Sequence, residues 1–225
     1  MSKKISSASM PNTTEVRLAG SFEAYVKPAH EGYAKAQFDL GLCYYYGWGV
    51  DQDYAEAVEW YIKAAEQNLP DAQYNLGLCY DNGTGAAQDY KKAVKWYTRA
   101  AQQGHERAQY NLGLCFDNGA GVTKSYEKAV FWYQKAAAQG VAKAQYNLGR
   151  CYFNGNGVAK DLSLAAKLWG KAAAQGYAKA QYYYGYCCEN GIGVAADKAK
   201  AKEFYKKAAM QEYKRAEEAL KNYKL

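Results

Sequence analysis

Histidine is scarce in this 225-residue sequence, and its first twenty residues contain no apolar run. Only His30 and His105 could serve as imidazole ligands, which argues against a zinc site. Lys3 and Lys4 are followed by polar residues, so the start has the pattern of neither a secretory signal nor a membrane span. We expect a disordered lead over residues 1–20 and a cytoplasmic protein, or a periplasmic or secreted one if a signal has been removed.

Signatures of catalysis and phosphate binding are also missing. Five Gly-x-Gly loops occur, but none follows a predicted strand or continues to Gly-Lys-Ser/Thr, so we interpret them as turns. Ser125-Tyr126-Glu127-Lys128 fits the Ser-x-x-Lys pattern of penicillin-recognising hydrolases, yet neither Ser-Asp-Asn nor Lys-Thr-Gly is present. The sequence predicts no catalytic residue, no metal and no cofactor.

The net charge of +7 is spread along the chain instead of being gathered into a basic arm. A positive surface favours acidic partners, and nucleic-acid binding usually shows a clustered basic patch. We therefore expect a protein or peptide partner and no nucleic acid, and we expect the chain to be a monomer.

A 36-residue unit restarts five times at an Ala-Gln pair, in the segments 36–41, 72–77, 108–113, 144–149 and 180–185. Such a period is typical of a chain that stacks one supersecondary unit many times. We expect repeats over 36–71, 72–107, 108–143, 144–179 and 180–215, a half repeat over 21–35 and a capping helix over 216–225.

Each repeat is predicted to contain two helices, which we call the first and the second helix. The first helix, such as 108–118, ends at an Asn-Gly pair suited to the left-handed conformation. The second helix, such as 90–103, ends at a glycine such as Gly104. The residues expected to cap the second helices are Asp53, Asp89, Ser125, Asp161 and Asp197.

The repeated string Leu-Gly-x-x-Tyr, Gly-x-Gly-Val-x-x-Asp and Lys-Ala-x-x-Trp-Tyr-x-Lys-Ala-Ala resembles the Sel-one-like repeat (SLR) family, over about residues 21 to 225. The resemblance implies an all-α, right-handed α/α superhelix (solenoid), similar to tetratricopeptide arrays, that serves as a non-enzymatic adaptor, commonly in bacteria. Cysteine-rich members carry a disulfide in each repeat, but alanines such as Ala65 and Ala72 occupy those positions here. A β-lactam-binding hydrolase and an effector that engages a host protein remain alternatives.

One cysteine recurs in each repeat, at Cys43, Cys79, Cys115, Cys151 and Cys187. Equivalent positions in stacked helices lie about 8–10 Å apart, beyond the reach of a disulfide. We expect these thiols to be small buried core residues, and Trp60, Trp96 and Trp132 to be core residues as well. Cys188 replaces an aromatic residue of the other repeats, and we expect it to be more exposed.

One stripe on each first helix is predicted to line the concave groove, as in related superhelices. It contains the residue before the repeat alanine and those four, seven and eleven positions later, which share one helix face. An asparagine ladder offers a donor and an acceptor to a peptide backbone, and basic neighbours suit an acidic segment or a C-terminal carboxylate. The predicted peptide-binding residues are Asn75, Asn111, Asn147, Arg107, Lys143, Arg150, Lys179, Leu78, Leu114, Asn82, Asn118, Asn154, Tyr183 and Tyr186. Alternatively, the ladder asparagines tie neighbouring helices together.

Overall fold

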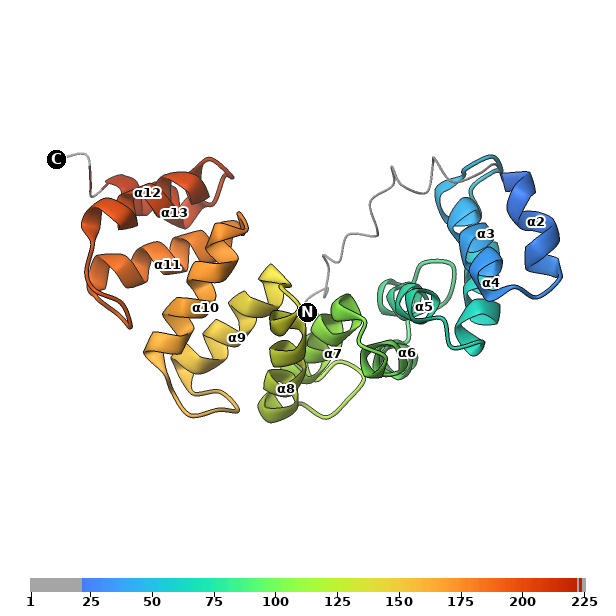
Figure 1. Ribbon diagram of the computed structural model, residues 1–225, viewed down its shortest axis with the longest axis horizontal. Helices are drawn as coiled ribbons and strands as arrows, with labels where there is room; N and C mark the ends of the chain where they lie inside the picture. Colours follow the sequence, from blue (N-terminus) through green and yellow to red (C-terminus); the bar gives the residue numbers. More distant parts are fainter. Residues whose placement is uncertain (1–21, 222, 224–225) are drawn as a thin grey trace. The chain divides into compact units, whose positions relative to one another are not determined.

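Helices account for all the regular secondary structure in the part of the chain that the computed structural model describes, residues 22–221 and 223 (Figure 1). The all-α class of solenoid repeats predicted from the sequence is confirmed. The chain forms two compact units that divide after Lys124. The predicted lead over residues 1–20 lies outside the described residues.

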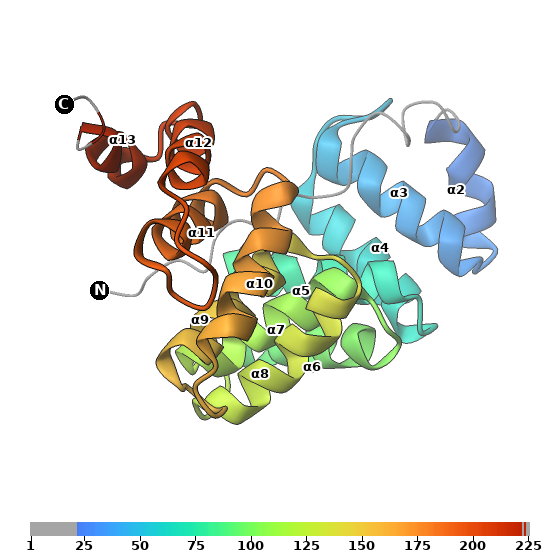
Figure 2. The same cartoon turned by 60° about the vertical axis from the view of Figure 1, so that its left-hand side comes forward.

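Unit 1 contains the half repeat, the first two complete pairs of helices and the first helix of the third repeat. Its helices are α2 (Phe22–His30), α3 (Ala34–Tyr46), α4 (Tyr54–Glu66), α5 (Pro70–Asn82), α6 (Tyr90–Gln102) and α7 (Glu106–Asn118). Unit 2 contains α8 (Tyr126–Ala138), α9 (Ala142–Asn154), α10 (Leu162–Ala174), α11 (Ala178–Asn190), α12 (Lys198–Ala209) and α13 (Lys214–Lys221). Within each unit every helix packs against the next one along the chain, as α3 does between α2 and α4 in Figure 2.

The second helices begin at the capping residues that the sequence predicts. Asp53, Asp89, Ser125, Asp161 and Asp197 each accept a hydrogen bond from a backbone N–H of the first turn, at 2.8–3.3 Å. The first helices end as predicted too, because Gly83 and its equivalents adopt the left-handed conformation, and the Gly83 N–H donates to the Cys79 carbonyl.

The Gly-x-Gly loops are packing elements of the stack. A Cβ atom on Gly121, the second glycine of its loop, would lie 2.2 Å from the backbone oxygen of Tyr90, at the start of α6 in the preceding repeat. A side chain at this position would therefore push neighbouring repeats apart. The interpretation of these loops as turns agrees with this contact.

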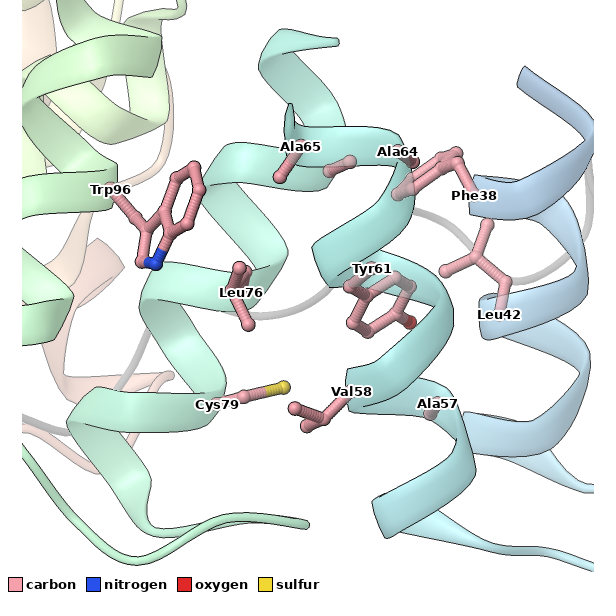
Figure 3. Packing of buried hydrophobic residues seen from close by; sticks show 11 residues of the cluster. Phe38, Leu42, Ala57, Val58, Tyr61, Ala64, Ala65, Leu76, Cys79 and Trp96 are labelled. Atoms are coloured by element: carbon pink, nitrogen blue, oxygen red, sulfur yellow. The ribbon is translucent and has the colours of Figure 1, made fainter. Parts of the chain in front are cut away.

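Within each unit, a ring from a second helix packs on a glycine of the first helix in the same repeat. A Cβ atom on Gly77 would lie 2.6 Å from the Tyr97 ring, and one on Gly41 would lie 2.7 Å from the Tyr61 ring. Figure 3 shows Tyr61 between its neighbouring helices, with Leu76, Cys79 and Val58 in the same core cluster. The glycines thus set how closely the paired helices approach.

The cysteines are buried and unpaired, as expected for the column of one thiol per repeat. Burial raises the pKa of Cys43 to about 11 and that of Cys79 to about 12, so these thiols are unreactive near neutral pH. The expectation that Cys188 is more exposed is wrong. Its side chain is buried because it packs with Ala201 and Tyr205 in the core of the last repeat.

One residue after a second helix adopts a left-handed conformation that suits glycine better than the residue present. Gly104, Gly140 and Gly176 hold this position with φ of 85–92°, whereas Glu212 holds it with φ of 60°. We expect Glu212→Gly to stabilise the protein by about 1 kcal/mol, because a non-glycine residue pays for this conformation. Thermal or urea unfolding measures the change.

The matched control introduces the same backbone strain at Gly176, the equivalent position of the preceding repeat. Gly176 has open space around its missing Cβ, so Gly176→Glu adds only backbone strain and should destabilise by about 1–2 kcal/mol. Equal stability of wild type and both variants would contradict the strain at Glu212.

Candidate functional site

Glutamine side chains tie the first helices to the second helices on both sides. Gln73 Nε2 donates to the Ala65 carbonyl of the preceding repeat at 3.1 Å, and Gln73 Oε1 accepts from Gln103 Nε2 at 2.8 Å. The same pair of contacts recurs at Gln37 and Gln67, at Gln145 and Gln175, and at Gln181 and Gln211. Gln73 is fully buried. The invariant glutamine of the Ala-Gln pair is therefore a structural residue, which the sequence pattern alone did not reveal.

The three asparagines of the predicted ladder are also buried. Asn75, Asn111 and Asn147 are 1%, 4% and 6% exposed. Asn111 hydrogen-bonds the hydroxyl of Tyr97 on the preceding second helix. This position favours the interpretation in which the asparagines tie helices together, and peptide binding by them stays a prediction.

Tyr97 shows what such an asparagine contacts. Its ring packs on Gly77, and its hydroxyl donates to Asp81 Oδ2 at 3.1 Å. Burial raises the pKa of Tyr97 well above its ordinary value, and the Asp81 charge adds to this effect, whereas the Asn111 hydrogen bond opposes it. Burial also raises the pKa of Asp81 to about 6, against the lowering effect of the Tyr97 hydrogen bond.

The first complete repeat lacks this acidic partner. Tyr45 stands where the next repeat has Asp81, and its ring lies 6.4 Å from the Tyr61 ring. The Tyr61 hydroxyl consequently donates to no acceptor and lacks a partner at hydrogen-bond distance, although the nearby Asn75 amide opposes the rise in its pKa. Within the described residues, the other buried side-chain polar atoms without a partner are Tyr46 Oη, Tyr74 Oη and Asn75 Nδ2, all in unit 1.

The remaining predicted residues differ in exposure. Leu78 is buried, while Arg107, Leu114, Lys143, Arg150 and Tyr183 are half-buried. Asn82, Asn118, Asn154, Lys179 and Tyr186 are exposed. The amide of Asn118 donates to the Leu114 carbonyl of its own helix at 3.0 Å, which holds that side chain against its helix.

In unit 1 several charges of the predicted stripe are compensated internally. Lys35 Nζ lies 2.8 Å from Asp39 Oδ1, and His105 Nε2 lies 3.4 Å from Asp71 Oδ1. The hydrogen bond from His105 lowers the pKa of Asp71. His105 also caps α7 through Nδ1 and stacks on Tyr74. This imidazole is thus a structural group.

In unit 2 the stripe combines aromatic rings with basic side chains. Tyr183 packs 5.1 Å from Trp169 and 5.7 Å from Tyr146, and its hydroxyl accepts a hydrogen bond from Arg215 Nη1 at 3.2 Å. Lys179 and Tyr186 lie four residues before and three residues after Tyr183, on the same face of α11. We call Arg150, Lys179, Tyr183, Tyr186 and Arg215 the Tyr–Arg surface.

Arg215 was not among the residues predicted from the sequence. It belongs to the column of Lys143 and Lys179, 36 residues beyond Lys179, and α13 continues the series of first helices. Extending the repeat alignment by one more first helix would have identified it.

The structure also shows the local roles of the residues behind the alternative functions. Ser125 Oγ accepts a hydrogen bond from the Lys128 N–H and donates to Glu127 Oε2, so this serine is a helix cap. Residues 22–221 contain no group of three potential metal ligands. Helices in this part of the chain reach 13 residues and are not apolar enough to cross a bilayer.

Comparison with known proteins supports the assignment of the repeats. A family model described as Sel1 repeat matches residues 34–69, 70–105, 106–141, 142–177 and 178–213. Each of these repeats begins at the first residue of a first helix. The comparison with curated proteins gives no match.

Several solved structures are similar to this chain. A protective antigen of uropathogenic Escherichia coli strains that displays an SLR fold is 38% identical over 86% of this chain, with a TM-score of 0.83. The match spans 42% of that antigen's chain. A Sel1 repeat protein from Oxalobacter formigenes is 36% identical over 84% of this chain and 77% of its own, with a TM-score of 0.78. An immunity protein from Pseudomonas aeruginosa, 22% identical over 84% of this chain and 72% of its own, shares the fold alone with a TM-score of 0.51.

Tyr97 and Tyr61 form a matched pair for testing the buried hydroxyls. We expect Tyr97→Phe to destabilise the protein by about 1–3 kcal/mol, because Asp81 loses its hydrogen-bond donor in a buried site. Tyr61→Phe should leave stability unchanged or increase it, because its hydroxyl donates to no acceptor. Urea unfolding of both variants measures the difference, and an equal loss in the two would contradict the assignment.

The buried carboxyl of Asp81 makes stability depend on pH. Its folded pKa of about 6 lies above that of an unfolded aspartate, so the folded protein binds an additional proton between about pH 4 and 6. The stabilisation that this proton on Asp81 contributes is fully present below about pH 4 and is lost as the pH rises through about 6. Relative to Asp81→Asn, the wild type should lose up to about 3 kcal/mol over this window, at about 1.4 kcal/mol per pKa unit.

Unfolding free energies measured at intervals from pH 4 to 7 test this dependence. Asp53→Asn removes an exposed carboxylate while keeping a capping side chain, and it controls for the loss of charge. A constant difference between wild type and Asp81→Asn across the window would rule out the raised pKa.

Proposed function

We propose that this chain, which belongs to the Sel1 repeat family, binds a protein partner through the Tyr–Arg surface of unit 2. Members of the family are commonly protein-interaction scaffolds. The role proposed here is accordingly a non-enzymatic adaptor. The expectation of a cytoplasmic location is retained as part of the proposal.

The observation that carries the proposal is the exposure of aromatic and basic side chains together on α11 and α13. Tyr186 is 37% exposed, and Lys179 and Arg215 are exposed beside the half-buried Tyr183. Tyrosine and arginine are enriched at the energetic centres of protein interfaces, because they combine a large contact area with hydrogen-bonding groups. The Tyr–Arg surface has this composition.

The charge of this surface points to an acidic segment of the partner. Arg150, Lys179 and Arg215 are cationic, and Arg215 already places its guanidinium at the Tyr183 hydroxyl. A guanidinium pairs with a carboxylate through two parallel hydrogen bonds, which suits an aspartate, a glutamate or a C-terminal carboxylate. The partner proposed is therefore a peptide segment rich in carboxylates.

The alternative function, a β-lactam-binding hydrolase, has no comparable support among the described residues. The serine of its Ser-x-x-Lys pattern caps α8 and hydrogen-bonds Glu127, which places it in the column of capping aspartates. An adaptor role uses the features on the Tyr–Arg surface without requiring a nucleophile.

A selection from a library of random twelve-residue peptides on the full chain tests the proposal. We expect enrichment of Asp and Glu among the binders, and fluorescence anisotropy should show affinities at least tenfold weaker for Lys179→Glu/Arg215→Glu. The reversed charges repel a carboxylate that the wild type attracts. Affinity should also fall as salt concentration rises.

Lys91→Glu/Lys95→Glu provides a control with the same change in charge on the exposed side of α6. Peptides should bind this variant nearly as well as the wild type. Binders with no acidic enrichment, or equal affinity for both double variants, would show that the Tyr–Arg surface is not the binding site.

A further inference from the structure

Unit 2 contains a pocket of about 530 Å³ that the predicted groove does not include. Its walls come from the second helices α10 and α12, from Tyr184 of α11 and from the loop that follows α11. The volume lies within the range of small-molecule sites in proteins. The side chains that give it chemical character are Lys167, Lys171, Lys200, Tyr184 and Phe204.

The pocket exists because two side chains are smaller here than in unit 1. Between α4 and α6, the equivalent positions hold Ile62 and Trp96, which pack in one core cluster. Figure 3 shows Trp96 in this cluster. Between α10 and α12 they hold Gly170 and Phe204. The volume of an isoleucine side chain and part of an indole is thus missing from the wall between the two second helices.

Gly170 is an unusual choice for the interior of a helix. It costs about 1 kcal/mol relative to alanine, because glycine loses more backbone freedom. A Cβ atom there would lie 3.1 Å from Cε2 of Tyr184, which replaces the leucine found at this position in the earlier repeats. Gly170 therefore admits the Tyr184 ring into the pocket wall.

The charge at the pocket is also different from that in unit 1. Lys167 and Lys171 lie one turn apart on α10, and neither forms an ion pair or hydrogen bond with the described residues. Lys200 Nζ lies 5.1 Å from the centre of the Tyr184 ring. On α4, the position of Lys167 is Glu59 and that of Ala174 is Glu66, so carboxylates flank Lys63 there. The pocket lining carries three ammonium groups and no carboxylate.

We propose that this pocket binds a phosphate monoester attached to an aromatic ring. The Tyr184 and Phe204 rings offer apolar and stacking surface to the ligand's ring. The three lysines provide point charges suited to a phosphate dianion, which a single carboxylate would match less fully. The site is separate from the Tyr–Arg surface, because its lysines lie on second helices.

Titration with phenyl phosphate, followed by calorimetry and by NMR shifts of the full chain, tests the proposal. We expect phenyl phosphate to bind at least tenfold more tightly than inorganic phosphate or phenol, because only phenyl phosphate uses both the rings and the charges. Adenosine monophosphate and a phosphotyrosine peptide then distinguish a free nucleotide from a modified protein as the source of this chemistry.

Two variants address the two halves of the site. Lys167→Gln/Lys171→Gln changes only exposed side chains and should weaken phenyl phosphate binding at least tenfold. Gly170→Thr places at this position the residue that α6 carries as Thr98, and it should abolish binding by refilling the pocket. Lys91→Gln/Lys95→Gln on α6 is the matched control for charge. Because these residues lie in unit 1 and leave unit 2 unaltered, this variant should bind phenyl phosphate like the wild type.

The outcome is independent of peptide binding, since Lys179→Glu/Arg215→Glu should retain the affinity for phenyl phosphate. Unfolding temperatures identify any variant that fails to fold, and the lysine pair decides the question if Gly170→Thr is unstable. The proposal is overturned if inorganic phosphate binds as tightly as phenyl phosphate, or if Lys167→Gln/Lys171→Gln binds like the wild type.

Discussion

Within each unit, the contact between a glycine of a first helix and a ring of the following second helix fixes the repeat. With Gly77 lacking a side chain, the Tyr97 ring lies on the backbone of α5, and its hydroxyl reaches Asp81 on the same helix. The same hydroxyl also meets Asn111 of the next repeat. One ring therefore sets the spacing within a repeat and supplies a polar contact to its neighbour.

This arrangement explains which features of the structure could be predicted from the sequence and which could not. Helix ends follow from local residues such as Asp89 and Gly83, so their positions could be predicted from capping chemistry alone. The buried amides could not, because Gln73 meets Gln103 thirty residues away and an exposed and a buried asparagine look alike in a sequence. Cys188 was misjudged for the same reason, since its burial depends on Ala201 and Tyr205 from the next helix.

The repeats vary in a coordinated way around this shared contact. Trp169 replaces the ring-column tyrosine in the fourth repeat, and Phe153 replaces the acidic partner, so the two rings pack 5.2 Å apart. The Trp169 N–H then donates to the Tyr146 carbonyl at 3.0 Å, which satisfies the donor without a carboxylate. In the first complete repeat the acid is also lost, to Tyr45, but no acceptor replaces it for the Tyr61 hydroxyl.

The same comparison separates residues that build the stack from residues free to recognise a ligand. In unit 1, residues that depart from their columns, such as Tyr45 and Tyr46, pack against the core, and the hydroxyl of Tyr46 is buried. Changes in unit 2 instead leave Tyr186 exposed and remove bulk at Gly170 and Phe204. A side chain that departs from its column without improving the packing leaves surface, charge or space available for another molecule. This criterion places both proposed sites in the last repeats, on α11 and α13 for the proposed peptide and between α10 and α12 for the proposed aromatic phosphate ester.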